Sequence, residues 1–288
     1  MPKKILIDAG HYANFGKSPC KTSPTYYEGN MTWALCASLV AELKKYSFDV
    51  ATTRADIKTD VPVLKRGQMA KGYDLFISLH SNSPGGKDDN KVNNDLDLPV
   101  IIVPLVHSIA FETFAGKIGE AIHTLLDTKY IYKKKGYKIY TKKNPNNPSL
   151  DYYGVIRGAV SVGCKNAMII EHSFHTCEKT VAFLLKQSNL DKIAAKEAEI
   201  IADFFGVKKT EATTPKTEPA ETTGFQKGDV VVVIGNYYYQ SKQPIPKFVK
   251  ENKWIVRSVK GDRVVIDESV DGKHHICSPV AAKDLKKV

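Results

Sequence analysis

The sequence lacks the features that mark membrane proteins, disulfide-bonded proteins and sequence-specific DNA-binding proteins. It has 288 residues, and no apolar run approaches the roughly 20 residues that a membrane span needs. Its five cysteines are odd in number, widely spaced and without a CxxC pair, so we expect neither a disulfide framework nor an all-cysteine zinc site. Only five of its 42 cationic residues are arginine. Because arginine is the preferred group for bidentate contacts to bases, this scarcity argues against specific nucleic-acid recognition.

The N-terminus also lacks the pattern of a secretory signal. An apolar run begins at residue 5, which leaves no room for the apolar core of a signal peptide. We therefore expect a protein that is made and held in the cytoplasm and acts on a target outside the membrane only after release. The formal net charge of +11 favours binding to a polyanion, either nucleic acid or an acidic polymer surface.

The chain divides into three parts by composition. Residues 208–224 carry no aromatic side chain and almost nothing to bury, which predicts a flexible linker. Residues 225–288 contain short β-branched runs separated by Gly-Asp or Asp-Gly turn signals, which is typical of a small all-β module. Residues 1–207 are long enough for one α/β domain.

In residues 1–207, apolar strand-like runs alternate with segments of helical period. The expected strands are residues 4–7, 48–52, 74–79, 99–103 and 167–170, and the expected helices are residues 32–45, 63–71, 110–126 and 193–205. This alternation predicts an α/β fold with a largely parallel sheet. In such sheets the ligand site lies beyond the carboxyl ends of the strands.

Three of the predicted strands end in polar residues, namely His11, His80 and Glu171. Parallel strands bring these ends to one edge, so the two histidines become neighbours in space. Two imidazoles and one carboxylate are a common catalytic zinc set with a fourth position left for water. Glu28, which opens the first helix, is the best-placed carboxylate, and Glu42 in the middle of that helix is a poorer one. We predict one Zn²⁺ on His11, Glu28 and His80.

Glu171 is the candidate for proton transfer, because a carboxyl group at the end of an apolar strand is partly desolvated and its pKa rises. A single histidine at a strand end is more often a structural residue than a ligand, and Glu28 alone would be an ordinary carboxylate at a helix N-terminus. Because two histidines occur together at such positions, we favour the ligand role over the structural one. Asn82, His172 and His175 lie close to these positions and are candidate substrate contacts, with packing as the alternative for the two histidines.

Together these residues resemble the zinc-dependent N-acetylmuramoyl-L-alanine amidases, and more narrowly the catalytic domain of a phage endolysin. The motifs that carry the resemblance are Asp-Ala-Gly-His at residues 8–11, Glu28, Thr53-Arg54, Arg66, residues 74–82, Ile170-Glu171 and Phe174. The resemblance implies a mixed six-stranded sheet flanked by helices, zinc on His11, Glu28 and His80, and Glu171 as the catalytic carboxylate. The sequence departs from the family at Tyr12, Lys71 and residues 98–103. These departures leave the predicted metal ligands intact and concern the substrate contacts.

Residues 225–288 resemble the SH3-like modules that bind bacterial cell walls. They carry 12 cationic and 7 anionic residues, which suits an anionic wall polymer. Tyr237, Tyr238, Tyr239 and Trp254 are the candidate wall-binding aromatics, and the alternative is that some of them fill a small barrel core.

We therefore predict a two-domain peptidoglycan hydrolase that cleaves the bond between N-acetylmuramic acid and L-alanine, either as an endolysin or as an autolysin. Its partners are peptidoglycan and anionic wall polymers, with no specific nucleic acid and no membrane insertion. Two alternatives stay open from the sequence. One is a zinc peptidase that cuts within the stem peptide, and the other is a non-catalytic basic protein that binds a polyanion or the wall.

Overall fold

The computed structural model describes residues 2–209, 224–239 and 244–288. The chain separates into two compact units, Met1–Ala212 and Thr213–Val288, and each is considered by itself. Most of the predicted linker, residues 210–223, lies outside the described residues. Among the described helices, none combines the length and the apolar character that a bilayer crossing requires.

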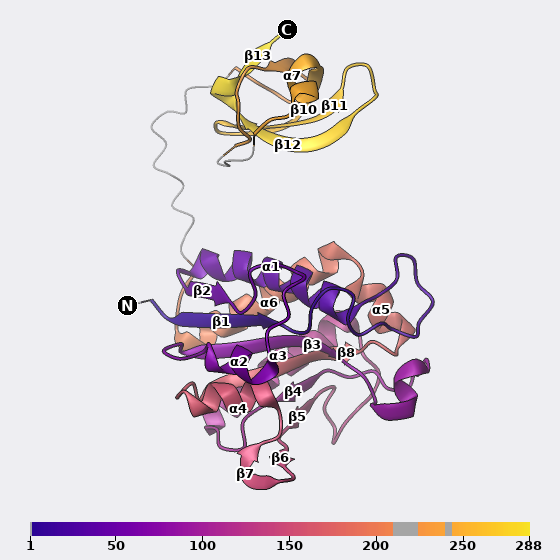
Figure 1. The fold of residues 1–288 in the computed structure, drawn as a ribbon, viewed down its shortest axis with the longest axis vertical. Coiled ribbons are helices and arrows are strands. Elements are labelled where there is room, and N and C mark those ends of the chain that lie inside the picture. The colour runs from indigo at the N-terminus through magenta and orange to yellow at the C-terminus, as the bar shows by residue number, and fades with distance from the viewer. Residues whose placement is uncertain (1, 210–223, 240–243) are drawn as a thin grey trace. The chain divides into compact units, whose positions relative to one another are not determined.

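The first unit is built on a six-stranded sheet with the order β2-β1-β3-β8-β4-β5 (Figure 1). The strands are β1 (Lys4–Ala9), β2 (Asp49–Thr52), β3 (Leu75–Asn82), β4 (Val100–Ile102), β5 (Lys138–Tyr140) and β8 (Ala167–Phe174). All neighbouring pairs are parallel except β4 and β8, which run antiparallel. The predicted mixed α/β fold with a six-stranded sheet is confirmed.

Helices cover both faces of this sheet because the strand side chains alternate between two apolar cores. On one face, α1 (Glu28–Leu43), α3 (Ile109–Leu126) and α6 (Gln187–Phe205) pack on a core that includes Ile77 and Ile170. On the other face, α4 (Gly154–Ser161) packs on Phe76 and Ile169, and α2 (Val63–Gln68) packs on α4. Figure 1 shows α1 and α6 on one side of the sheet and α2 and α4 on the other.

The remaining elements of the first unit are short and lie in its connections. They are η1 (Lys44–Tyr46), η2 (Gly86–Asn90), the hairpin of β6 (Lys143–Asn144) and β7 (Asn147–Asp151), and α5 (Glu178–Leu184). The sequence pattern did not predict β5, which has only three residues and shows no alternation of its own. Without β5 the sheet would end at β4, so the missed strand changes the surface next to the predicted site.

The second unit is a five-stranded antiparallel sheet with the order β12-β11-β10-β9-β13. Its elements are β9 (Val230–Val233), α7 (Lys247–Glu251), β10 (Lys253–Lys260), β11 (Arg263–Ser269), β12 (His275–Ala281), η3 (Ala282–Asp284) and β13 (Leu285–Lys287). Trp254 is fully buried in its core and donates from Nε1 to the carbonyl of Val249 at 2.7 Å. The small β-rich unit is as expected, and its likeness to SH3 modules stays a prediction.

Candidate metal centre

His11, Glu28 and His80 meet at the carboxyl edge of the sheet. Glu28 lies between the two imidazoles, with Oε1 2.8 Å from His80 Nδ1 and Oε2 3.2 Å from His11 Nε2. One donor atom from each residue lies within 4.8 Å of the others. His11 follows β1, His80 belongs to β3 and Glu28 is the first residue of α1, so three segments far apart in sequence supply the group. Within the described residues, this is the cluster of His, Cys, Asp and Glu whose geometry could hold a metal ion.

Close backbone packing sets the positions of these donors. His11 has a φ of +59°, which turns the chain sharply after β1. A side chain at Gly10 would overlap the His80 ring, so this turn requires a glycine. Gly16 has a φ of +67°, and a Cβ there would lie 2.8 Å from Oε2 of Glu28. The predicted ligands therefore pack against glycines that leave no room for another residue type.

Two buried arginines hold the turn that presents His11. Arg66 donates to Oδ1 of Asp8 at 3.0 Å and to the carbonyls of Ala9 at 2.9 Å and His11 at 2.7 Å. Arg54 donates to the carbonyl of Ala9 at 3.0 Å. Both guanidinium groups are almost fully buried. Their N–H groups therefore donate to backbone carbonyls instead of to water, and these bonds hold the turn in place. The motif residues Arg54 and Arg66 thus act as supports of the metal-ligand loop.

The electrostatics of the cluster follow from the buried carboxylate. Burial alone would raise the pKa of Glu28, but its bonds to His11 and His80 outweigh burial and hold that pKa well below its ordinary value. Burial opposes a charge on His80 as well, yet the Glu28 carboxylate raises the pKa of His80 to about 9. The backbone N–H of Ser81 donates to Oε1 of Glu28 at 3.0 Å and further stabilises the anion. Glu28 therefore stays a carboxylate, and in the metal-free protein its charge is balanced by the proton on His80, whose place a metal cation can take.

Glu171 stands beside this cluster, in register with His80 on the neighbouring strand. Its Oε2 is shielded from solvent and has no hydrogen-bond partner. Burial raises the pKa of Glu171 to about 7, with the Glu28 charge adding to the effect and His80 opposing it. All four side chains line one cavity of about 490 Å³. A carboxyl group with a pKa near neutrality can both accept and return a proton at physiological pH.

A family profile of the N-acetylmuramoyl-L-alanine amidases matches residues 5–203, which is more than half of the chain. The chain belongs to this family. Membership makes it a peptidoglycan hydrolase, and the family is generally zinc-dependent. The matched residues contain the complete cluster and Glu171, and they lie entirely in the first unit. The comparison with curated proteins gives no match.

Solved structures, amidases among them, share the fold of the first unit. Cwp6 from Clostridium difficile is 20% identical with a TM-score of 0.57, and the similarity covers 71% of this chain but only 29% of that one. The catalytic domain of CwlV from Bacillus (Paenibacillus) polymyxa var. colistinus is 20% identical with a TM-score of 0.54, covering 72% and 99% of the two chains. An N-acetylmuramoyl-L-alanine amidase from Clostridium difficile 630 is 16% identical with a TM-score of 0.56, covering 72% and 98%.

The structure of this amidase corrects the prediction for His172. Its side chain is fully buried, with Nε2 2.9 Å from Oε1 of Glu197 on α6 and Nδ1 2.9 Å from the carbonyl of His80. It therefore supports the backbone of His80 and does not reach the catalytic cavity. Glu197 was missed, although its spacing from Ile193 and Ile201 placed it on the buried face of the helix. A charged residue on the apolar face of this helix was the signal in the sequence that could have indicated a buried polar partner.

The other predicted contacts divide between core and surface. His175 is buried with Nδ1 3.0 Å from Oγ of Ser81, which is the packing alternative rather than a substrate contact. Asn82 is half-buried and lines a second cavity beside the metal centre. In the second unit, the fully buried Trp254 is a core residue and cannot contact the wall, which corrects that prediction. Its aromatics Tyr237, Tyr238 and Tyr239 are exposed or half-buried, so they stay candidates.

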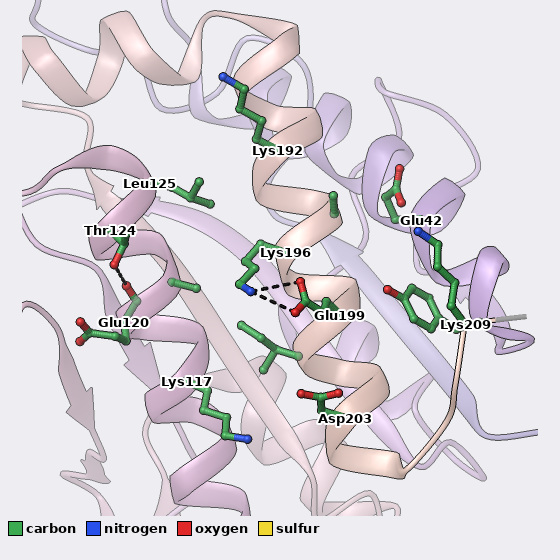
Figure 2. A pocket seen from close by; sticks show the side chains of 14 residues that line it. Glu42, Lys117, Glu120, Thr124, Leu125, Lys192, Lys196, Glu199, Asp203 and Lys209 are labelled. Atoms are coloured by element: carbon green, nitrogen blue, oxygen red, sulfur yellow. Dashed lines mark hydrogen bonds and ion pairs between the residues drawn. The ribbon is translucent and has the colours of Figure 1, made fainter. Parts of the chain in front are cut away.

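A larger hollow of about 830 Å³ lies between α1, α3 and α6, on the face of the sheet opposite to the one that α2 and α4 cover (Figure 2). Figure 2 shows Lys196 directed at Glu199, and the two form an ion pair of 3.1 Å. The charged residues that line the hollow balance one another and are Lys117, Lys192, Lys196, Lys209, Glu42, Glu120, Glu199 and Asp203. No histidine or cysteine of the described chain lines it, so it does not contain a cluster like that of the smaller cavity. The weak sequence candidate Glu42 lies at this hollow, away from the metal centre.

Proposed function

We propose that the first unit is a zinc-dependent amidase that hydrolyses the bond between the lactyl group of N-acetylmuramic acid and L-alanine. In this proposal His11, Glu28 and His80 hold one Zn²⁺, and Glu171 transfers the proton. The observation that carries the proposal is the meeting of three metal donors and one unpartnered carboxylate oxygen in a single cavity.

The donors present fit zinc. Two imidazole nitrogens and one carboxylate oxygen are ligands that Zn²⁺ accepts, and three protein ligands leave a position open for water or substrate. When bound, the ion acts as a Lewis acid and lowers the pKa of water from about 15.7 to about 7. The buried anionic Glu28 favours the cation, and the carbonyl of His80 is already fixed by His172. Such hydrogen-bond support of a ligand is usual around metal sites.

Glu171 supplies the acid and base chemistry. Its carboxylate accepts the proton of the attacking water and then returns that proton to the leaving amide nitrogen, a contribution of about 10²- to 10⁴-fold. A pKa of about 7 suits both steps, because neither protonation state is strongly disfavoured at neutral pH. Its shielded Oε2 has no hydrogen bond to a protein group that would compete for the transferred proton.

The test compares Glu171→Gln with His80→Ala and measures bound zinc beside the rate of muramoyl-peptide hydrolysis. We expect Glu171→Gln to keep zinc and to lose about 10²- to 10⁴-fold in turnover, since only the proton carrier is removed. His80→Ala loses both zinc and activity. The matched control is Glu120→Gln, an exposed carboxylate at the hollow of Figure 2, which changes neither.

Mass spectrometry of digested walls identifies the bond. A new amino-terminal L-alanine with an intact muramic acid supports the amidase, whereas a cut within the peptide supports a peptidase. If Glu171→Gln lyses walls as fast as the parent chain, the assignment of Glu171 is wrong.

For the second unit we propose wall anchoring. The excess of cations in residues 225–288 favours an anionic wall polymer, and Tyr237, which is 55% exposed, offers an aromatic face for stacking. A covalent tether between an anchor and an enzyme raises the local concentration of the enzyme at its substrate without any new contact.

A further inference from the structure

A second cavity of about 440 Å³ adjoins the catalytic cavity, and Ser83 and Tyr153 line both. Part of its lining is aliphatic and includes the buried Val100 and Ile102 of β4. Four tyrosines and a phenylalanine complete its lining, namely Tyr130, Tyr132, Tyr140, Tyr153 and Phe174. Residues 98–103, which depart from the family pattern, thus form part of this cavity.

The register of the sheet ties this cavity to the catalytic residues. His80 on β3 is opposite Glu171 on β8, Glu171 is opposite Val100 on β4, and Val100 is opposite Lys138 on β5. Side chains directly opposite one another point to the same face of a sheet. Neighbouring strands are about 4.8 Å apart, so the backbone of Lys138 lies roughly 10 Å from that of Glu171. One row across the sheet therefore carries a metal donor, the proton carrier, an apolar spacer and a cation.

Lys138 is the cation of the second cavity. It is half-buried, and its Nζ lies 4.5 Å from the ring centroid of Tyr140 and 5.1 Å from that of Tyr132. Within the described parts of the chain it forms no ion pair with a carboxylate, and none of the residues that line this cavity is acidic. A cation held over aromatic rings, in a lining that offers no counter-ion, suits an anionic group that arrives with the ligand.

We propose that this cavity is a subsite for the stem peptide and that Lys138 binds the free carboxylate of the second amino acid after the scissile bond. This inference rests on the proposed amidase function. An extended peptide advances about 3.5 Å per residue, so a backbone span of roughly 10 Å corresponds to two to three residues and brings the second residue of the stem within reach of the long Lys138 side chain. The tyrosines enclose the aliphatic part of the peptide, and Asn82 at the rim offers an amide for its backbone.

The alternative occupant is a sugar ring of the glycan strand. Aromatic rings would also stack on a sugar, but a neutral saccharide gives no partner to Lys138. The two occupants differ in one property, because only the peptide makes binding depend on a negative charge. The test therefore varies the charge of the substrate and of residue 138 together.

The substrates are two muramoyl tripeptides with the stem L-Ala-γ-D-Glu-L-Lys amide, one with a free α-carboxylate on the glutamate and one with that group amidated. The enzymes are the full chain loaded with zinc and its variants Lys138→Met and Lys138→Arg. We expect the parent chain to prefer the carboxylate substrate in kcat/KM by about tenfold to a hundredfold, the range of a charge-assisted hydrogen bond. Lys138→Met abolishes the preference, mainly by raising KM for the carboxylate substrate. Lys138→Arg keeps most of the preference.

The matched control is Lys142→Met, which removes an exposed cation that lies 3.8 Å from the ring centroid of Tyr152 and lines neither cavity. It leaves the preference unchanged. Equal loss with both substrates in Lys138→Met, or no preference in the parent chain, overturns the peptide assignment and favours a neutral occupant. If the parent chain cleaves neither substrate at the muramoyl amide, the proposed function itself fails, and this outcome is distinct from the others.

Discussion

Replacing Arg66 by methionine tests whether the buried ion pair with Asp8 holds the metal-ligand turn in place. The side-chain exposures of Arg66 and Asp8 are 4% and 0%. Methionine keeps most of the buried volume but removes five hydrogen bonds, two of which reach the carbonyls of Ala9 and His11. Asp8 then keeps hydrogen bonds from two hydroxyl groups and a through-space attraction to Arg54, but it loses its direct ion pair in a fully buried position.

Breaking a buried pair by removing one partner costs about 3–5 kcal/mol. This is a large share of the roughly 5–15 kcal/mol that stabilises a folded domain. For a unit of this size the melting temperature should fall by about 6–20 °C. Calorimetry of the full chain measures this transition, and a zinc titration of the same sample at low temperature shows whether the His11 turn has loosened. We expect weaker zinc binding as well as the lower melting temperature.

The double variant Arg66→Met with Asp8→Asn distinguishes the charge from the loss of packing. It removes the uncompensated carboxylate, so it should recover part of the lost stability. The control Arg157→Met removes a guanidinium that donates to the carbonyls of Asp151 and Tyr152, and it should cost less. A loss below about 1 kcal/mol in Arg66→Met, the range of an exposed ion pair, would refute the reasoning.

Three further outcomes follow from the site and the two-unit organisation. Because the pKa of His80 is raised to about 9 in the metal-free protein, zinc must displace a proton below that pH, and calorimetric titration should show affinity rising with pH up to about 9. The carboxylate form of Glu171 is lost as the pH falls through its pKa, so kcat/KM should decline on the acid side at or below about pH 7, the bound cation favouring the lower value. Deletion of residues 225–288 should weaken adsorption to purified walls in a sedimentation assay while zinc content is kept, and full adsorption of the shortened chain would contradict the anchor.

Local patterns were sufficient to predict which residues meet in the candidate site. Strands β1, β3 and β8 each consist of an apolar run followed by a polar residue, and a parallel arrangement brings such ends to one edge whatever the details of packing. His11, His80 and Glu171 were therefore predictable from the sequence. Glu28 was predictable with them because it opens the first helix, about one loop length after His11.

The surroundings of the site were not predictable in the same way. His172 and Glu171 are adjacent in sequence, but alternation along β8 sends one side chain into the core under α6 and the other into the catalytic cavity. Only the packing of α6 against the sheet reveals that Glu197 is the partner of His172. Trp254 likewise gave no sign of whether it would be covered or exposed.

The sequence by itself determined the α/β class, the β-rich second unit, the candidate metal donors and the candidate proton carrier, because each depends on periodicity or on residue type at the end of a strand or the start of a helix. The tertiary structure alone decided the order of the strands beyond β8. There β4 pairs antiparallel and β5 has three residues, so no local signal fixed their neighbours. That pairing places Lys138 in one row with Glu171 and His80, because cross-strand neighbours are set by hydrogen bonding between segments far apart in the chain and not by the residues within either segment.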